Sequence, residues 1–163
     1  MTRLTTILLS DLLDCDVKSD QGINHGKGFS VWMHPPFHRI LGWTSKPSSL
    51  KLSLDVWRLD QLKGIEFNNV FVQGSSSASD QATINRFPTL INAGLLNKNG
   101  EKMANIVDFV FQPTTGKILY YLVSRSNPKI PGSSRWSLQV NDIKDQQPGS
   151  VFSNLHSIND LPL

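Results

Sequence analysis

Two histidines spaced four residues apart, His34 and His38, are the first side chains in this sequence that could do chemistry. Imidazoles at this spacing bind a metal ion when both lie on one face of a helix. Pro35 and Pro36 stand between them and exclude that helix. On a hairpin the two rings could still converge, and His25 could join them, but no cysteine or carboxylate follows at a spacing typical of zinc sites. We predict ordinary turn residues here, and no metal or other cofactor.

An acidic cluster lies near the start of the chain and consists of Asp11, Asp14, Asp16 and Asp20. Its spacing is not that of an EF-hand loop and no glutamate closes it, so we predict a solvated turn and not a calcium site. Cys15 lies inside this cluster. Because neighbouring carboxylates raise the pKa of a thiol, the sequence argues against a nucleophile and predicts a small buried side chain.

The remaining signals for a nucleophile or a nucleotide site are incomplete. The serine-rich segments 75–79 and 133–134 lack the Gly-x-Ser-x-Gly turn of serine hydrolases. The segment Gly26-Lys27-Gly28 lacks the spacing of either phosphate-binding glycine motif. The sequence therefore predicts that the chain is not an enzyme.

Two loops combine cations, prolines and aromatic side chains, and these loops are the best candidates for binding a partner. Arginine and aromatic residues are enriched in protein interfaces, and they also stack on unpaired bases. The competing interpretation is that the tryptophans beside these loops belong to the core and the loops only connect strands. The candidate partner-binding residues are His34, Phe37 and Arg39 in the first loop, and Arg125, Lys129, Arg135 and Trp136 in the second.

Charge and composition set limits on the partner. The 163 residues carry a formal net charge of +3, and the cations are scattered along the chain. Nucleic-acid binding favours a clustered basic stripe, so this charge is weak support for an RNA partner. A single cysteine cannot form an internal disulfide. No apolar stretch reaches the ~18 residues that span a bilayer, and no signal-peptide cleavage site is present. We expect a cytoplasmic protein, with peripheral association as the one membrane role left open.

The second half of the sequence repeats the first. Gly22 has its counterpart in Gly100, each in a polar turn where a tight hairpin favours positive φ. Three further matches follow in the same order at offsets of 78, 79 and near 81 residues: Arg39-Ile40-Leu41 with Lys117-Ile118-Leu119, Val56 to Leu59 with Arg135 to Leu138, and Asn69-Val70-Phe71 with 149–152. The serine-rich segment between the halves is typical of a flexible linker. We therefore predict one domain at residues 1–73, a linker at 74–81 and a second domain at 82–163.

Hydrophobic periodicity predicts strands in both halves. Residues 29–33 and 50–54 alternate between apolar and polar positions, as half-buried strands do. Residues 102–111 and 117–124 are rich in β-forming residues, and the proline and glycine in the loop between them favour a hairpin. Short strands separated by regular turn signals predict an all-β fold of two small barrels packed together.

The second half resembles a PRC-barrel domain, the small barrel found in the photosynthetic reaction-centre H subunit and in a bacterial ribosome maturation factor. The residues that carry the resemblance are Asn99 to Phe111, Pro113 to Ser124, Trp136-Ser137-Leu138 and Asp142-Ile143. The sequence departs from the family pattern at Ala104, where the family usually has glycine, and in the long loop 126–134. The first half fits less well, chiefly at His34-Pro35-Pro36. As a whole, the chain is similar to tandem two-repeat PRC-barrel proteins of cyanobacterial type.

This resemblance implies a non-catalytic adaptor or assembly factor that docks on a larger complex, either photosynthetic or ribosomal, through its barrel loops. A photosynthetic partner would place the chain at the periphery of the thylakoid membrane. The alternative function is an RNA-binding module that acts in ribosome maturation. The divergence of the first half around His34 to Arg39 suggests that one unit is kept for the fold and the other is altered for contact.

Overall fold

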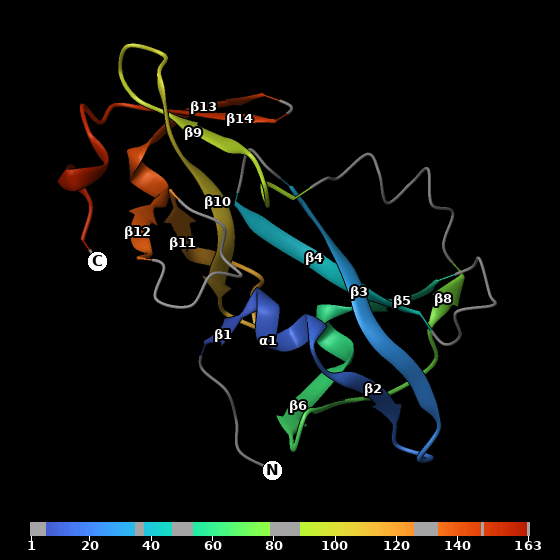
Figure 1. The fold of residues 1–163 in the computed structure, drawn as a ribbon. Helices are drawn as coiled ribbons and strands as arrows, with labels where there is room; N and C mark the ends of the chain where they lie inside the picture. Colours follow the sequence, from blue (N-terminus) through green and yellow to red (C-terminus); the bar gives the residue numbers. More distant parts are fainter. Residues whose placement is uncertain are drawn as a thin grey trace. The chain divides into compact units, whose positions relative to one another are not determined.

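The computed structural model describes residues 6–34, 38–46, 54–78, 89–125, 134–147 and 149–162. The chain divides into two compact units (Figure 1). The first unit comprises Met1–Thr89 and Phe111–Lys117, and the second comprises Leu90–Val110 and Ile118–Leu163. The loop that we predicted to close a hairpin in the second half is therefore grouped with the first unit. The prediction of an all-β fold is confirmed, since the described part holds one five-residue helix and short 3-10 turns besides its strands.

The first unit is built on one curled sheet with the strand order β6-β7-β2-β3-β4-β5-β8. Its long strands β3 (Asn24–His34) and β4 (Arg39–Lys46) are antiparallel neighbours, drawn in blue and cyan in Figure 1. β2 and β7 pair in parallel, and the other neighbours are antiparallel. The remaining elements are β1 (Ile7–Leu8), α1 (Leu9–Leu13), β2 (Asp16–Ser19), β5 (Asp55–Arg58), a 3-10 turn (Leu59–Gln61), β6 (Leu62–Glu66), β7 (Asn69–Val72) and β8 (Ser77–Ala78).

The sheet of the second unit has the order β12-β11-β10-β9-β14-β13. Its elements are β9 (Gly94–Leu96), β10 (Lys102–Phe111), β11 (Ile118–Ser124), β12 (Trp136–Gln139), a 3-10 turn (Val140–Asp142), β13 (Ile143–Gln147), β14 (Ser150–Ser153) and a last 3-10 turn (Ile158–Asp160). β9 and β14 are the parallel pair, as β2 and β7 are in the first unit. The two sheets thus share one strand order, and each has a 3-10 turn after the strand at the equivalent place.

Backbone hydrogen bonds recur at equivalent positions of the two units. The amide of Gly28 donates to Cys15 O in the first unit. In the second unit the amide of Ile106 donates to Ala93 O, and both of these residues lie 78 positions further along the chain. The turn glycines predicted to have positive φ do so, with φ of 80° at Gly22 and 81° at Gly100. The internal repeat of the sequence is therefore also a repeat of backbone structure.

The structure corrects the register of this repeat in its second part. Trp57 pairs with Trp43 in the first unit, and the equivalent pair in the second unit is Leu138 with Tyr121. The match of Trp57 with Trp136, made on the shared Trp, is therefore wrong by two positions. The loop before β12 is three residues longer than the loop before β5, so the offset changes from 78 (Arg39 with Lys117) to 81 (Trp57 with Leu138).

Large aromatic side chains fill the core of each unit. Trp43 and Trp57 are fully buried and stack with ring centroids 6.4 Å apart. Phe109 and Tyr121 are also fully buried and meet edge to face at 5.8 Å. Burial raises the pKa of the Tyr121 hydroxyl, so it stays protonated. For Trp43, the interpretation as a core residue is the one that the structure supports.

The segment predicted as a flexible linker begins with an ordered stretch. Ser77–Ala78 form β8, which pairs with β5 and covers its outer edge. Gln61 fixes the chain just before β8, since its Nε2 donates to Gln73 O at 3.1 Å and to Ser75 O at 2.9 Å. In the second unit, Ser137 on β12 donates its amide to Pro162 O at 2.9 Å. In each unit, the segment that follows the last strand pair, β6–β7 or β13–β14, therefore covers an edge strand. Residues 79–81 lie outside the described part.

Candidate functional site

Arg39, a predicted partner-binding residue, lies in a row of basic residues. It begins β4, pairs with His34 on one side and forms an isolated antiparallel bridge with Lys117 on the other. Arg39 and Lys117 are both exposed, and in the described part of the chain no ion pair reaches either. Because side chains opposite each other in a ladder lie about 5 Å apart at Cβ, two uncompensated cations lie together here.

Gly116 makes this approach of the two segments feasible. Its φ of 77° belongs to the left-handed region, and its carbonyl accepts the amide of Ile40 at 2.8 Å. A Cβ at this position would lie 2.9 Å from Leu59 Cδ1 and would collide with Ile40 O. Sequence reasoning used Gly116 only as a hairpin signal, because nothing local to the loop indicates its packing against β4.

The rest of the first predicted loop is described only in part. His34 is placed as the last residue of β3, although its side chain and Phe37 lie outside the described residues. His38 has a φ of 47°, and burial lowers the pKa of its imidazole. A neutral, half-buried ring in a tight turn agrees with the interpretation of His38 as a turn residue.

The second predicted loop has two more exposed cations, one at each of its ends. Arg125 directly follows β11 and Arg135 directly precedes β12, so both exposed side chains flank the same end of one antiparallel ladder. Trp136 begins β12, pairs with Val123 and is half-buried. Lys129 lies outside the described residues. The described part of this loop therefore offers two exposed arginines and a half-buried aromatic side chain at one end of the ladder.

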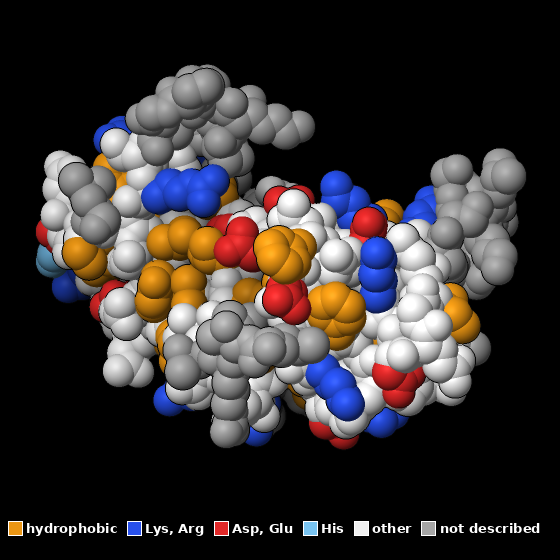
Figure 2. Space-filling model, turned by 90° about the horizontal axis from the view of Figure 1, so that it is seen from below, with side chains coloured by type: hydrophobic (Ala, Val, Ile, Leu, Met, Phe, Trp, Pro, Cys, Tyr) orange, Lys and Arg blue, Asp and Glu red, His pale blue; other side chains and the backbone are white. Residues whose placement is uncertain are grey.

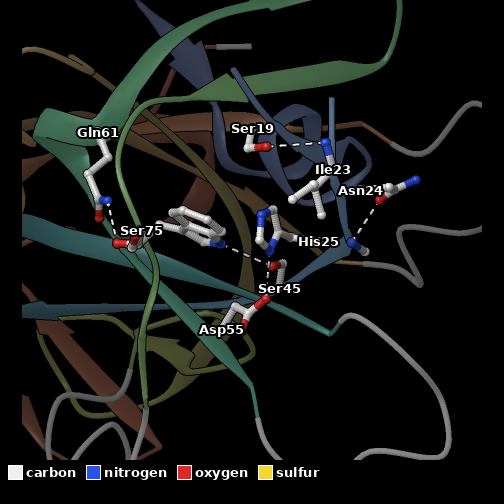
Figure 3. Close-up of polar contacts among 10 residues, drawn as sticks. Ser19, Ile23, Asn24, His25, Ser45, Asp55, Gln61 and Ser75 are labelled. Carbon is white, nitrogen blue, oxygen red and sulfur yellow. Dashed lines mark hydrogen bonds and ion pairs between the residues drawn. The ribbon is translucent and has the colours of Figure 1, made fainter. Parts of the chain in front are cut away.

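A histidine and an aspartate form the most prominent polar pair of the first unit. His25 Nδ1 and Asp55 Oδ2 are 3.0 Å apart, and the imidazole meets the Trp57 ring edge to face at 4.8 Å (Figure 3). Ser45 lies close by but is fully buried, and its Oγ accepts the Trp57 indole N–H at 3.0 Å. This arrangement cannot act as a nucleophile with its base, because the hydroxyl is sealed from solvent. Instead, the pair ties β3 to β5 across β4.

Sequence reasoning missed the His25–Asp55 pair. His25 was considered only as a third metal ligand, and Asp55 was not singled out. The two residues are 30 positions apart, and only the strand order brings them together. No local signal in the sequence could have found this contact.

Three carboxylates surround Cys15. Burial raises the pKa of this thiol, and the charges of Asp11, Asp14 and Asp16 raise it further, with Lys27 opposing them. The Cys15 side chain is 4% exposed, and its Sγ donates to Asp11 O at 3.1 Å. The predictions of a buried side chain and of a raised pKa are confirmed. Within the described ranges, no three His, Cys, Asp or Glu side chains stand close enough to hold a metal ion.

Three exposed apolar side chains are further candidates for contact with a partner, and sequence reasoning did not find them. Phe67 is 88% exposed, Phe29 is 54% exposed and Ile23 is 53% exposed, and all three belong to the first unit. Phe29 is the extra residue of a bulge between β3 and β4, and Lys46 Nζ lies 5.7 Å from its ring centroid. On the face shown in Figure 2, hydrophobic side chains are exposed among charges of both signs.

A comparison with protein-family models and with curated proteins finds no match to this chain. In the described residues, no helix has the length and apolar character needed to cross a membrane.

Proposed function

We propose that this chain is a non-catalytic adaptor or assembly factor, built from two PRC-barrel-like units packed together, which docks on a larger complex. The single observation that carries this proposal is the pair Arg39 and Lys117, two exposed cations on paired backbone without an ion-pair partner in the described residues. Like charges opposite each other weaken a ladder, so a fold has no structural reason to keep them there. An acidic partner surface would neutralise them.

The arginine pair of the second unit supports the same proposal. Arg125 and Arg135 flank one end of the β11–β12 ladder beside Trp136. Arg39 begins a strand, and Lys117, Arg125 and Arg135 each directly adjoin one, which lowers the entropy lost when a partner orders them. Arginine and tryptophan are among the residue types most enriched where binding energy is concentrated. By the resemblance in sequence, the complex is photosynthetic or ribosomal.

Co-purification from native cells tests this function. The tagged chain is compared with the double variants Arg39→Ala/Lys117→Ala and Arg125→Ala/Arg135→Ala. The matched control is Lys63→Ala/Lys144→Ala, which removes the same two charges from exposed positions at equivalent places on β6 and β13. We expect one or both cation-pair variants to weaken the association on the order of tenfold while the control does not. A chain that co-purifies with nothing would contradict the adaptor function.

RNA binding is the second candidate function, and the arginine pair beside Trp136 favours it, because this combination also suits unpaired bases. A titration with ribosomal RNA distinguishes it from protein docking. An RNA-binding chain should lose affinity steeply between low and moderate salt, in proportion to the phosphates it neutralises. If no RNA is retained at low salt, this second function fails.

A further inference from the structure

The tip of the β6–β7 hairpin displays an aromatic side chain to solvent. Glu66 pairs with Asn69, so the connection consists of two residues, Phe67 and Asn68. Phe67 is 88% exposed, the highest value among the exposed large hydrophobic side chains of the described residues. A phenyl ring placed in this way contributes nothing to the core.

The backbone at this tip also suits phenylalanine poorly. Both connecting residues have positive φ, 51° at Phe67 and 63° at Asn68. A two-residue hairpin loop with positive φ at both positions is a type I′ turn, for which asparagine and glycine are strongly preferred. A bulky side chain in the left-handed region is an outlier, and strain of this kind is concentrated at functional sites.

The second unit shows that the fold does not require an aromatic residue here. The equivalent two positions, 81 residues further on, are Pro148 and Gly149, and Gly149 has a φ of 79°. The amide of Asp16 donates to Asn68 O, and the amide of Gly94 donates to Gly149 O in the same way. The same turn support is therefore built with and without the exposed ring.

Hydrogen bonds hold the backbone of the turn that carries Phe67. Besides the bond from Asp16 to Asn68 at 3.1 Å, the Asn69 side chain donates Nδ2 to Phe67 O at 3.2 Å. β7 behind the turn is paired on both sides, with β6 and with β2. A preorganised aromatic side chain loses little conformational entropy on binding, which is the property of residues that dominate interface energy.

The charges beside this turn are acidic. Glu66 directly precedes Phe67, and Asp16 lies in register with Asn69 on the neighbouring strand. Asp14 and Asp11 gather with Asp16 around Cys15. On the other side of Asp16, the residue in register on β3 is Lys27. A negatively charged border repels an anionic lipid surface or RNA and complements a basic protein surface.

We propose that the β6–β7 hairpin tip is a docking element whose Phe67 ring inserts into an apolar pocket, bordered by Lys or Arg, on a partner protein. This inference rests on the proposed docking function and names one contact for it. The pair Arg39 and Lys117 lies elsewhere on the first unit, because Arg39 starts β4 whereas Asp16 is aligned through Lys27 with Lys46, the last residue of β4. The carboxylates Glu66 and Asp16 adjoin the hairpin tip, with Lys27 and Lys46 one and two strands further on, so this tip and the pair Arg39 and Lys117 contact different surfaces of the partner complex.

Photo-crosslinking in native cells tests this site. Benzoylphenylalanine, which keeps an aromatic ring, replaces Phe67 in one variant and Phe29 in the control variant. We expect a discrete protein adduct from position 67 and not from position 29, with the linked peptide of the partner in an apolar pocket that has basic residues at its border. Adducts only with lipid, no discrete adduct, or a pocket with an acidic border would overturn the proposal.

The variant Phe67→Asn tests by thermal stability and by partner retention whether the ring serves binding or the fold. Asparagine suits a type I′ turn, so the thermal midpoint should rise by about 2–4 °C while the crosslinked partner is lost from pull-downs. A fall in the midpoint would mean that the ring serves the fold, and retention of the partner would also overturn the proposal. Vesicles of phosphatidylglycerol serve as the lipid probe, and binding to them that depends on Phe67 would favour a membrane instead.

The results also separate this site from the proposed function. If the wild-type chain co-purifies with a complex but Phe67→Asn is retained as well, the adaptor function stands and the hairpin site fails. If the wild-type chain retains no partner, both fail together.

Discussion

The two units share a backbone plan but differ in the side chains at equivalent positions. His38, just before β4, corresponds to Gly116, just before β11, and both have positive φ. In the core, the pair Trp43 and Trp57 corresponds to Tyr121 and Leu138. The repeat therefore preserves strand order and these positive φ angles, while different side chains fill the core of each unit.

The surfaces differ more than the cores do. Cys15 and its acidic neighbours Asp14 and Asp16 correspond to Ala93, Asn92 and Gly94, none of which is charged. The hairpin tip with Phe67 corresponds to one with Pro148 and Gly149. Features that the fold needs recur in both units, so a feature found in only one unit is a candidate for function. This comparison can be tested by exchanging equivalent residues.

The largest effect is expected at Gly116. Gly116→Ala places a Cβ in the left-handed region and against Ile40 O and Leu59 Cδ1, so we expect a loss of about 3 kcal/mol or more in the free energy of unfolding. The control is Gly100→Ala, which has the same sign of φ but nothing within 4 Å of the added atom, and should cost about 1 kcal/mol. Urea denaturation measures both, and equal losses would contradict the packing described for Gly116.

An effect of similar size separates the two tryptophans that the sequence comparison matched. Trp57→Ala removes a fully buried ring together with its stack on Trp43 and its hydrogen bond to Ser45, and should cost about 3–5 kcal/mol. Trp136→Ala removes a half-buried ring at the start of β12 and should cost about 1 kcal/mol. Chemical denaturation of both variants checks the corrected register, which comparable losses would refute.

The sequence predicted the parts of this fold that depend on local chemistry. Glycines in polar turns indicated positive φ, and alternation of apolar residues indicated strands, since these signals act within a few residues. The sequence comparison misplaced the register after residue 46, because it matched Trp57 with the other tryptophan, Trp136. The buried residue at the equivalent position is Leu138. The order of strands, and with it the pair His25–Asp55, depends on contacts between distant residues and leaves no local trace.

The candidate sites were predicted unevenly for the same reason. Arg39, Arg125 and Arg135 could be named because residue type alone suggests an interface. Their neighbours could not, since Lys117 reaches Arg39 only through the bridge between distant segments. Phe67 was not singled out, because neither its exposure nor its positive φ is visible in the sequence.

A smaller effect is expected from pH at His38. Because burial lowers the pKa of its imidazole below the ordinary value of 6.5, the unfolded chain takes up a proton at a higher pH than the folded chain does. Stability should therefore be complete above about pH 6.5 and should fall as the pH drops below it. His38→Asn, which keeps a side chain suited to positive φ but does not titrate, should reduce this dependence. Thermal midpoints between pH 5 and 7.5 measure it, and parallel profiles for the two proteins would exclude His38 as the cause.

The smallest effect on stability is expected at Cys15. The reactivity of its thiol reports on the acidic surroundings that the second unit lacks. Cys15→Ala should change the free energy of unfolding by about 1 kcal/mol or less, because the equivalent position in the second unit is the buried Ala93. The native thiol should react slowly with a disulfide reagent at pH 8, since burial and then the charges of Asp11, Asp14 and Asp16 raise its pKa. Asp14→Asn should speed that reaction by lowering the thiol pKa, with the unfolded chain as the reference rate. An unchanged rate in Asp14→Asn would mean that burial alone protects Cys15, and the acidic cluster would then act only on partners outside the chain.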